Sequence, residues 1–131
     1  MARDQLLVVD DHPINMKLIS FLLELEGYEV RTAGMASEAL AILESYRPRL
    51  ILMDLQMPGM NGFELTQQLK AADATKDIII IAVTAYAMKG DEQRARSAGC
   101  DHYITKPIDN DELPRLVARL LQAAQPRSEA P

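Results

Sequence analysis

The sequence predicts an α/β fold, a three-layer sandwich around a five-stranded parallel sheet. Short runs rich in valine, isoleucine and leucine recur at residues 5–9, 28–32, 50–53, 78–83 and 100–104. Longer segments with helical periodicity separate these runs, so strands and helices should alternate along the chain. Strands that are apolar throughout and are joined by helices indicate a parallel sheet covered on both faces.

Each helical segment has one apolar face that the sheet could cover. The four faces consist of Ile14, Leu18, Leu22 and Leu25; Ala36, Ala39, Leu40 and Leu43; Leu65 and Leu69; and Leu113, Leu116, Val117, Leu120 and Leu121. Gly27 and Gly99 fall where helices commonly end in a left-handed residue. Asp109, followed three residues later by Glu112, predicts the N-cap of the last helix.

Length and charge limit the classes of protein that fit. The 131 residues suit a single domain, which we expect to span residues 5–124, with a disordered polar tail at 125–131. The net charge of -5 argues against nucleic acid or an anionic membrane as the main partner. One cysteine, no signal-peptide core and no apolar stretch of about 20 residues predict a soluble cytoplasmic protein.

Four of the expected strands end in polar residues. Asp10 and Asp11 follow the first, Asp54 follows the third, Thr84 follows the fourth and Lys106 follows the fifth. In a parallel sheet these ends share one edge, and the strand order 2-1-3-4-5 would make the four strands near neighbours. We therefore expect the five side chains to meet in one pocket.

The chemistry of this pocket points to a cation and a phosphoryl group. Three close carboxylates repel one another unless a proton or a cation lies among them. Oxygen ligands on loops favour Mg²⁺, with Mn²⁺ as an alternative, over zinc. Lys106 could neutralise one phosphoryl oxygen and Thr84 could donate a hydrogen bond to another, which leaves Asp54 as the candidate nucleophile.

Over residues 5–122 the chain resembles the receiver domains of two-component response regulators. The resemblance covers the acidic pair in residues 8–15, the acceptor loop in 53–62, the hydroxyl in 83–85 and the basic end in 103–107. It implies the flavodoxin-like fold of that family. It also implies a phosphorylation-dependent switch in a two-component system or phosphorelay.

The resemblance assigns the acidic residues to phosphate transfer and metal binding. Asp54 would accept the phosphoryl group of a histidine kinase or of a histidine phosphotransfer protein. Asp11 and Asp54 would bind Mg²⁺ directly, and Asp10 would act mainly through a bound water. The backbone carbonyl of Gln56 would be the remaining protein ligand.

Other matched residues would transmit the signal. Lys106 would pair with the acyl phosphate, Thr84 would follow the phosphoryl oxygen inward, and Tyr103 resembles the aromatic switch residue that follows the threonine. The change would alter a face made of the fourth helix, fifth strand and fifth helix, through which a downstream protein binds. We expect a monomer or a weak phosphorylation-dependent dimer.

Within the family, residues 15–18 and 83–91 are most similar to single-domain DivK-type regulators and to the receivers of hybrid kinases. The sequence has no linker to a DNA-binding domain after the last helix, so we expect output through protein contacts. We expect no conventional enzyme activity beyond self-catalysed phosphotransfer and slow autodephosphorylation.

Three rival functions are weaker. A phosphatase with an aspartyl-phosphate intermediate needs a second acid two residues after the nucleophile, where Gln56 stands, and a flavodoxin-type carrier would not place Asp10 and Asp11 beside its phosphate. A degenerate receiver that acts only as a binding scaffold would normally have lost a metal-binding acid, the acceptor or the lysine.

Three further side chains have simpler interpretations. His12 is interpreted as a solvated loop histidine, Cys100 as a packed thiol and His102 as an imidazole at the solvent edge of the fifth strand. Tyr103 could equally be half-buried sheet packing, because its switch role rests on the resemblance alone.

Overall fold

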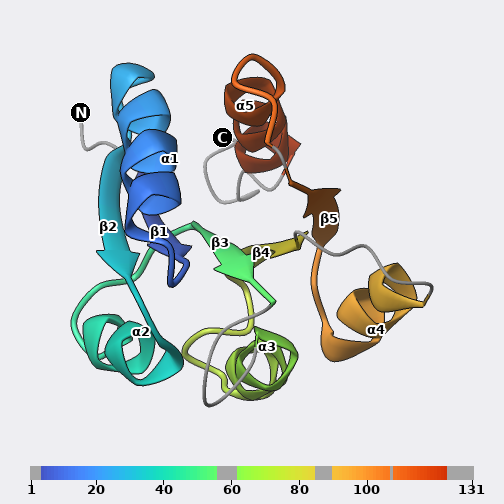
Figure 1. Ribbon diagram of the computed structural model, residues 1–131. Coiled ribbons are helices and arrows are strands. Elements are labelled where there is room, and N and C mark those ends of the chain that lie inside the picture. The colour runs from blue at the N-terminus through green and yellow to red at the C-terminus, as the bar shows by residue number, and fades with distance from the viewer. Residues whose placement is uncertain (1–3, 56–61, 85–89, 107, 124–131) are drawn as a thin grey trace, which may run out of the picture.

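A computed structural model describes residues 4–55, 62–84, 90–106 and 108–123, which form alternating strands and helices (Figure 1). In chain order the elements are β1 (Gln5–Val9), α1 (Pro13–Leu25), β2 (Glu29–Ala33), α2 (Ala36–Leu43), β3 (Leu50–Asp54), α3 (Gly62–Ala71), β4 (Ile79–Thr84), α4 (Asp91–Ala98), β5 (His102–Thr105) and α5 (Glu112–Ala123). The predicted alternation of strands and helices is confirmed. The tail predicted at 125–131 lies outside the described residues.

The five strands form one parallel sheet in the predicted order, β2-β1-β3-β4-β5. Val8 of β1 lies in register with Thr32 of β2 on one side and Leu52 of β3 on the other. β4 pairs with β3 and with β5, where Thr84 is in register with Thr105. The carboxyl ends of β1, β3, β4 and β5 therefore lie next to one another.

Helices cover both faces of the sheet and complete the predicted three-layer sandwich. α1 and α5 lie on one face, and α2, α3 and α4 lie on the other (Figure 1). Alternate residues of the central strands enter two separate apolar cores. Leu7 and Ile51 pack with α2 and α3, whereas Leu6 and Leu52 pack with α1 and α5.

The edge strand β2 differs from the prediction that all strands are apolar throughout. Only Ala33 of this strand is buried, and Glu29 and Arg31 reach water. A strand at the edge of a sheet needs little apolar surface, and charged residues there discourage pairing with another chain. The strand also lies one residue later than the predicted range 28–32.

The start of β5 was also predicted too early, at residue 100. The backbone N–H of Cys100 donates to the Ala95 carbonyl of α4, so this residue completes the helix end. The N–H of Asp101 makes the first bond to β4, 2.8 Å from the carbonyl oxygen of Ile80. Cys100 nevertheless is a packed thiol as predicted, because only 7% of its surface is exposed.

The predicted apolar face of α1, formed by Ile14, Leu18, Leu22 and Leu25, is wrong. Ile19 and Leu23 are the buried residues of this helix, and Met16 packs against the same core. α1 is apolar around most of its circumference, so periodicity alone could not choose the face that meets the sheet. Four large side chains are left exposed on α1: Ile14 (83%), Leu18 (46%), Phe21 (58%) and Leu25 (65%). We call these four residues the exposed stripe of α1.

The faces predicted for α2, α3 and α5 are confirmed, because their members are buried, apart from the half-buried Leu40 and Leu120. Gly27 and Gly99 are left-handed, with φ of 96° and 112°, as predicted for helix ends. The described helices are short, and none is long and apolar enough to cross a membrane.

The predicted N-cap of α5 is present. Asp109 Oδ1 accepts hydrogen bonds from the backbone N–H groups of Asp111 at 2.8 Å and Glu112 at 2.9 Å. The bonds from Glu112 and Asp111 stabilise the charged carboxylate and lower the pKa of Asp109.

Candidate functional site

The polar residues predicted to share a pocket lie at the carboxyl edge of the sheet. Asp10 and Asp11 directly follow β1, and Asp54 is the last residue of β3. Thr84 ends β4, the strand between β3 and β5, and Lys106 directly follows β5. The strand order therefore brings side chains that are up to 96 positions apart in the chain into one region.

Three carboxylates form the centre of this site. Asp10 and Asp54 are each only 2% exposed, and Asp11 is half-buried. One side-chain atom from each of these residues and one from His12 all lie within 4.8 Å of one another. Negative charges this close repel strongly where water is scarce, so the site favours a proton or a cation among them.

Lys106 supplies one positive charge to the acidic cluster. Its Nζ atom lies 3.2 Å from Asp10 Oδ2 and 3.6 Å from Asp54 Oδ2, and its side chain is 12% exposed. One ammonium group opposite three ionised carboxylates would leave an excess of negative charge. The pocket therefore attracts a further cation.

His12 lies at the rim of the site with a largely exposed side chain. Its Nδ1 atom is 3.2 Å from Asp10 Oδ1 and 3.1 Å from Asp11 Oδ1, and its backbone N–H also donates to Asp10 Oδ1 at 2.8 Å. The prediction of a solvated loop histidine is confirmed by its 64% exposed side chain. The contacts of His12 hold the carboxylates of Asp10 and Asp11 in position.

Backbone hydrogen bonds hold the ends of the neighbouring strands together. The N–H of Leu55 donates to the carbonyl of Val83 at 2.9 Å, and the N–H of Lys106 donates to the carbonyl of Thr84 at 2.8 Å. Thr84 itself is fully buried. A change at the end of β3 is thus connected through main-chain bonds to β4 and then to β5.

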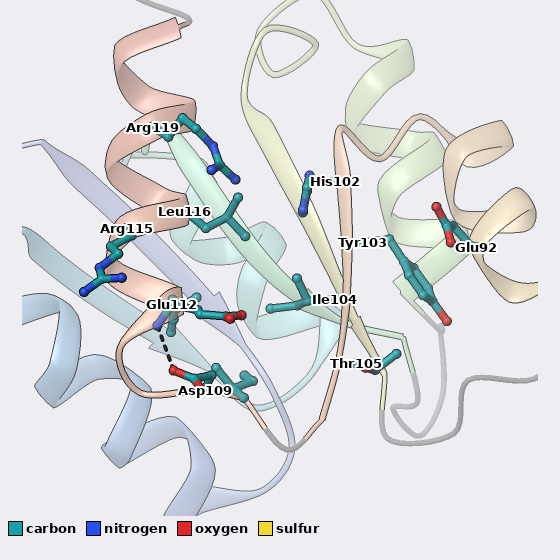
Figure 2. Close-up of a pocket in the computed structure, with 12 residues that line it drawn as sticks. Glu92, His102, Tyr103, Ile104, Thr105, Asp109, Glu112, Arg115, Leu116 and Arg119 are labelled. Atoms are coloured by element: carbon teal, nitrogen blue, oxygen red, sulfur yellow. Dashed lines mark hydrogen bonds between the residues drawn. The ribbon is translucent and has the colours of Figure 1, made fainter.

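Tyr103 lies on β5, beyond the acidic cluster. It is half-buried and packs against the core on the side of α2, α3 and α4. Figure 2 shows its ring on the side of β5 that faces α4, with the hydroxyl group directed away from α5. The packing interpretation is confirmed, while the switch role stays a prediction. Gln56, the predicted carbonyl ligand, lies outside the described residues.

Gly62 is a feature of the site that the sequence motif contains but whose role was not predicted. A Cβ atom at this position would lie 2.5 Å from the carbonyl oxygen of Asp54 and 2.8 Å from Cα of Leu55. The first residue of α3 can therefore approach the end of β3 only because it has no side chain. The sequence signal for this role is that Gly62 is the last residue of the acceptor loop, directly before the apolar face of the next helix.

The acidic residues present a donor set that fits a hard divalent ion. Asp10, Asp11 and Asp54 offer carboxylate oxygens, which Mg²⁺ and Mn²⁺ prefer, and their atoms are close enough to share one ion after small adjustments. His12 contributes a nitrogen, which Mg²⁺ seldom binds, and it lies on the exposed side. The site thus resembles an oxygen-ligand centre more than a zinc site.

The fold and the pocket together define a CheY-like α/β receiver, with a doubly wound parallel sheet and an acidic site at its carboxyl edge. The chain belongs to the response regulator receiver domain family, whose model matches residues 6–118. It is a receiver of two-component signalling, and such domains are signalling switches and not conventional enzymes.

Two curated relatives place the chain within the family. The polar-differentiation response regulator DivK of Brucella anthropi is 47% identical over 111 residues, which cover 85% of this chain and 88% of the relative. DivK of Brucella ovis is 45% identical with the same coverage. The predicted similarity to DivK-type regulators is confirmed.

Solved structures of receiver domains have the same fold as this chain. A CheY-like response regulator receiver domain from Methanospirillum hungatei matches with a TM-score of 0.88 and 31% identity, over 95% of this chain and 98% of that one. The receiver domain of the sensor histidine kinase PA1611 from Pseudomonas aeruginosa matches with a TM-score of 0.84 and 32% identity, over 92% and 99% of the two chains.

Proposed function

We propose that Asp54 accepts a phosphoryl group from a phosphohistidine of a histidine kinase or a histidine phosphotransfer protein. The observation that carries the proposal is the position of Lys106, whose Nζ lies 3.2 Å from Asp10 and 3.6 Å from Asp54. A lysine held beside two buried carboxylates is placed to neutralise the oxygens of an arriving phosphoryl group. We place this exchange in the cytoplasm, in keeping with the single unpaired cysteine.

The transfer forms one bond and breaks one. A carboxylate oxygen of Asp54 attacks phosphorus, and the bond from phosphorus to the imidazole nitrogen breaks. The nitrogen keeps the electron pair of that bond, and the histidine leaves as a neutral imidazole because its other ring nitrogen carries a proton. Slow attack of water on phosphorus then breaks the bond from phosphorus to the Asp54 oxygen, releases inorganic phosphate and regenerates the carboxylate. The protein thus catalyses both its own modification and its return to the resting state.

Asp10, Asp11 and Asp54 would hold the Mg²⁺ ion, with the carbonyl of Gln56 as the remaining protein ligand. Mn²⁺ suits the same donors. When bound, the ion neutralises negative charge on the phosphoryl oxygens and lets the anionic nucleophile and the anionic phosphoryl group approach. Support comes from the PA1611 receiver domain, which has a magnesium ion coordinated in its active-site cleft.

Thr84 and Tyr103 would convert the modification into a change of surface. Thr84 is fully buried at the end of the strand next to Asp54, and a phosphoryl group on Asp54 offers its hydroxyl a strong acceptor. Movement of Thr84 inward would make room for Tyr103, which is half-buried on the neighbouring strand. The output is then read on the face formed by α4, β5 and α5.

The phosphodonor protein would dock on the exposed stripe of α1. This stripe begins at Ile14, three residues after Asp11, and continues to Leu25, which is about 16 Å of helix. A protein that delivers a phosphohistidine to the pocket must contact its rim, and exposed large apolar residues beside it offer the binding surface. Four side chains are too few for a permanent interface, which suits a partner that must dissociate after transfer.

A receiver that acts only as an unphosphorylated scaffold is not favoured. Such a protein would lack part of the transfer machinery, whereas this chain retains three acids, the threonine and the lysine. An aspartyl-phosphate phosphatase is not favoured either, because the chain matches the receiver family over most of its length. We propose a monomer or a weak phosphorylation-dependent dimer.

Acetyl phosphate with Mg²⁺ tests the proposal without a cognate kinase. We expect intact mass spectrometry to show one added phosphoryl group on the wild type and none on Asp54→Asn. A matched control is Asp73→Asn, because the side chain of Asp73 is 99% exposed and lies outside the pocket. Chelation of the metal should abolish the modification.

Modification of Asp54→Asn to the same extent as the wild type would contradict the assignment of the acceptor. Lys106→Ala provides a second test, because it should leave phosphorylation detectable while uncoupling it from the surface change. Unaltered partner affinity of phosphorylated Lys106→Ala would count against the role of the lysine.

A further inference from the structure

Arg94 of α4 stacks on the aromatic ring of Phe63 of α3. The central carbon of its guanidinium group lies 4.0 Å from the centroid of the ring. That distance is well within the limit of about 6 Å at which a cation is attracted to an aromatic face. Arg94 is exposed, whereas Phe63 is half-buried and packs against the core on the side of α2, α3 and α4. We call this contact the Arg94–Phe63 stack.

The stack lies at the edge of the sheet that carries the acidic site. β3 and β4 are parallel neighbours, and α3 and α4 follow them in the chain, so both helices begin at the carboxyl edge. Phe63 is the second residue of α3, and Arg94 is the fourth residue of α4. The two helices lie side by side on one face of the sheet (Figure 1). The stack therefore joins their first turns.

The first turn of α3 is held against the end of β3. The N–H of Gly62, the residue before Phe63, donates to the carbonyl of Leu55 at 3.3 Å. A Cβ atom on Gly62 would lie 2.5 Å from the carbonyl oxygen of Asp54, so no free space separates the two backbone segments. Close-packed atoms transmit a displacement because no gap absorbs it. A movement of the Asp54 backbone would therefore displace Phe63.

α4 has little apolar surface with which to hold its place. Among the α4 side chains that the structure describes, only Ala95 and Ala98 are buried, and both are small. The end of the helix is fixed by the left-handed Gly99 and by Cys100, whose N–H donates to the Ala95 carbonyl at 3.0 Å. Because two alanines bury so little area, the position of the first turn depends strongly on the stack.

The two arginines of α4 make different kinds of contact. Arg96 donates to a carboxylate oxygen of Glu92, one turn earlier in the same helix, from Nε at 3.2 Å and from Nη2 at 3.0 Å. A pair of this kind stabilises the helix itself and does not determine where the helix lies. Arg94 instead contacts a neighbouring helix, so it positions α4 relative to α3.

We propose that the Arg94–Phe63 stack holds α4 in its resting position and is released when Asp54 is phosphorylated. The inference rests on the proposed function, because it takes Asp54 as the acceptor. A phosphoryl group adds negative charge and acceptor oxygens at the end of β3, and the groups that turn toward it there would move the start of α3. A ring that moves beyond about 6 Å no longer attracts the guanidinium.

This connection differs from the one through Thr84 and Tyr103. The latter runs through the ends of β4 and β5, whereas the stack connects β3 to α4 through α3. Both connections reach α4, because the Tyr103 ring lies on the side of β5 that faces this helix (Figure 2). If the stack favours the resting arrangement, its removal must favour the phosphorylated arrangement by the same factor.

Two substitutions remove the stack, one from each side. Arg94→Gln removes the cation at an exposed position, so the fold should be kept. Phe63→Leu removes the aromatic face and keeps an apolar side chain for the core. Arg96→Gln is the matched control, because the Arg96 side chain pairs with Glu92 within the same helix. Arg94→Lys keeps a cation over the ring and should behave as the wild type does.

Hydrogen exchange followed by mass spectrometry measures how firmly α4 is held in the unmodified protein. We expect the amides of α4 to exchange about fivefold faster in Arg94→Gln and in Phe63→Leu, the factor that corresponds to a cation–π contact at an exposed site. Exchange in Arg96→Gln should stay within about twofold of the wild type. The amides of α5 should exchange at the same rate in all the variants.

Binding of beryllofluoride with Mg²⁺ measures the connection to the acceptor, because this ion mimics a phosphoryl group. Calorimetric titration should show an affinity up to about fivefold higher in Arg94→Gln and in Phe63→Leu, since the mimic no longer has to release the stack. The double variant should show no further rise, because each substitution removes the same contact. Arg96→Gln and Arg94→Lys should stay within about twofold of the wild type.

Three results would overturn the inference. The first is an α4 that exchanges no faster in Arg94→Gln than in the wild type. The second is an affinity for beryllofluoride that is unchanged in Arg94→Gln or raised equally in Arg96→Gln. The third is a double variant in which the effects of the two substitutions add. If Phe63→Leu fails to fold, Arg94→Gln and its two controls decide.

The same samples separate this inference from the proposed function. If neither acetyl phosphate nor beryllofluoride acts on the wild type in the presence of Mg²⁺, the proposed function fails, and the release of the stack fails with it. Hydrogen exchange then still shows whether the stack holds α4. If Asp54 is modified and all the variants bind beryllofluoride as the wild type does, the proposed function stands and the inference about the stack fails.

Discussion

Replacing Gly62 with alanine tests whether the pocket depends on a close approach of two backbone segments. The new Cβ would lie 2.5 Å from the Asp54 carbonyl oxygen and 2.8 Å from Cα of Leu55, where ordinary contact begins at 3.4 Å. Both neighbours are main-chain atoms, so no flexible side chain can move aside. Either α3 or the end of β3 must shift.

The expected change in the free energy of unfolding combines a large loss from the clash with a small gain from helix propensity. Forcing a methyl group into a tight site lowers the free energy of unfolding by about 1–3 kcal/mol or more. Exchanging glycine for alanine in a helix returns up to about 1 kcal/mol, and less at the first residue. Because the clash involves backbone, we expect a net loss of about 2 kcal/mol, or about 1 M in the urea midpoint at a slope of about 2 kcal/mol/M.

Gly34→Ala is the matched control. A Cβ at Gly34 would meet only the Oε1 atom of Glu38 at 3.6 Å, an ordinary contact, and the backbone there is not left-handed. We expect its free energy of unfolding to stay within about 1 kcal/mol of the wild type or to rise.

Urea unfolding followed by circular dichroism measures both variants, and acetyl phosphate modification of the folded proteins shows whether Asp54 is displaced. The modified fraction should fall in Gly62→Ala and not in Gly34→Ala. Equal midpoints for the two variants would refute the argument from backbone contact.

Three further predictions concern titration and burial. The Tyr46 hydroxyl lies 3.0 Å from the Leu6 carbonyl oxygen and 3.1 Å from that of Glu29, and Tyr46→Phe should lower the free energy of unfolding by about 1 kcal/mol in thermal or urea unfolding. Burial raises the pKa of Tyr46 to about 12, so the unfolded chain loses this proton first. The wild type should therefore lose more stability than the variant between about pH 10 and 12, and equal losses would contradict this. The pKa of His102 is lowered by burial and by two nearby arginines, so the unfolded state binds a proton first as pH falls through about 6.5. His102→Gln should therefore lose less stability than the wild type between about pH 7 and 5. Equal pH profiles of stability for the two proteins would contradict this. Burial raises the pKa of the Cys100 thiol, so Ellman's reagent should react far more slowly with folded than with urea-unfolded protein, and equal rates would show that the thiol is accessible.

The central strands could be predicted because their chemistry leaves no alternative. Residues 50–53 and 78–83 contain no polar side chain, and such short runs are stable only with both faces covered. The face of α1 that meets the sheet could not be predicted in this way. Its stripe at Ile14 and Leu18 is as apolar as the one at Ile19 and Leu23, and only packing against β1 and α5 decides which is buried.

The candidate site, too, could be predicted from the sequence only in part. Parallel strands end at one edge, so the meeting of Asp10, Asp54 and Lys106 followed from the strand order alone. The role of Gly62 did not follow, because a backbone approach depends on distances that no residue pattern contains.

The exposed stripe of α1 has a consequence for how the protein behaves at high concentration. Large apolar side chains in water attract one another between molecules, and the net charge of -5 opposes this attraction by keeping copies apart. Added salt screens that repulsion, so self-association should grow with ionic strength. Polar substitutions at Phe21 or Leu25 would give a better-behaved sample, and on the proposal above they would also give one that its phosphodonor no longer recognises. Solubility and signalling therefore place opposite demands on the same helix.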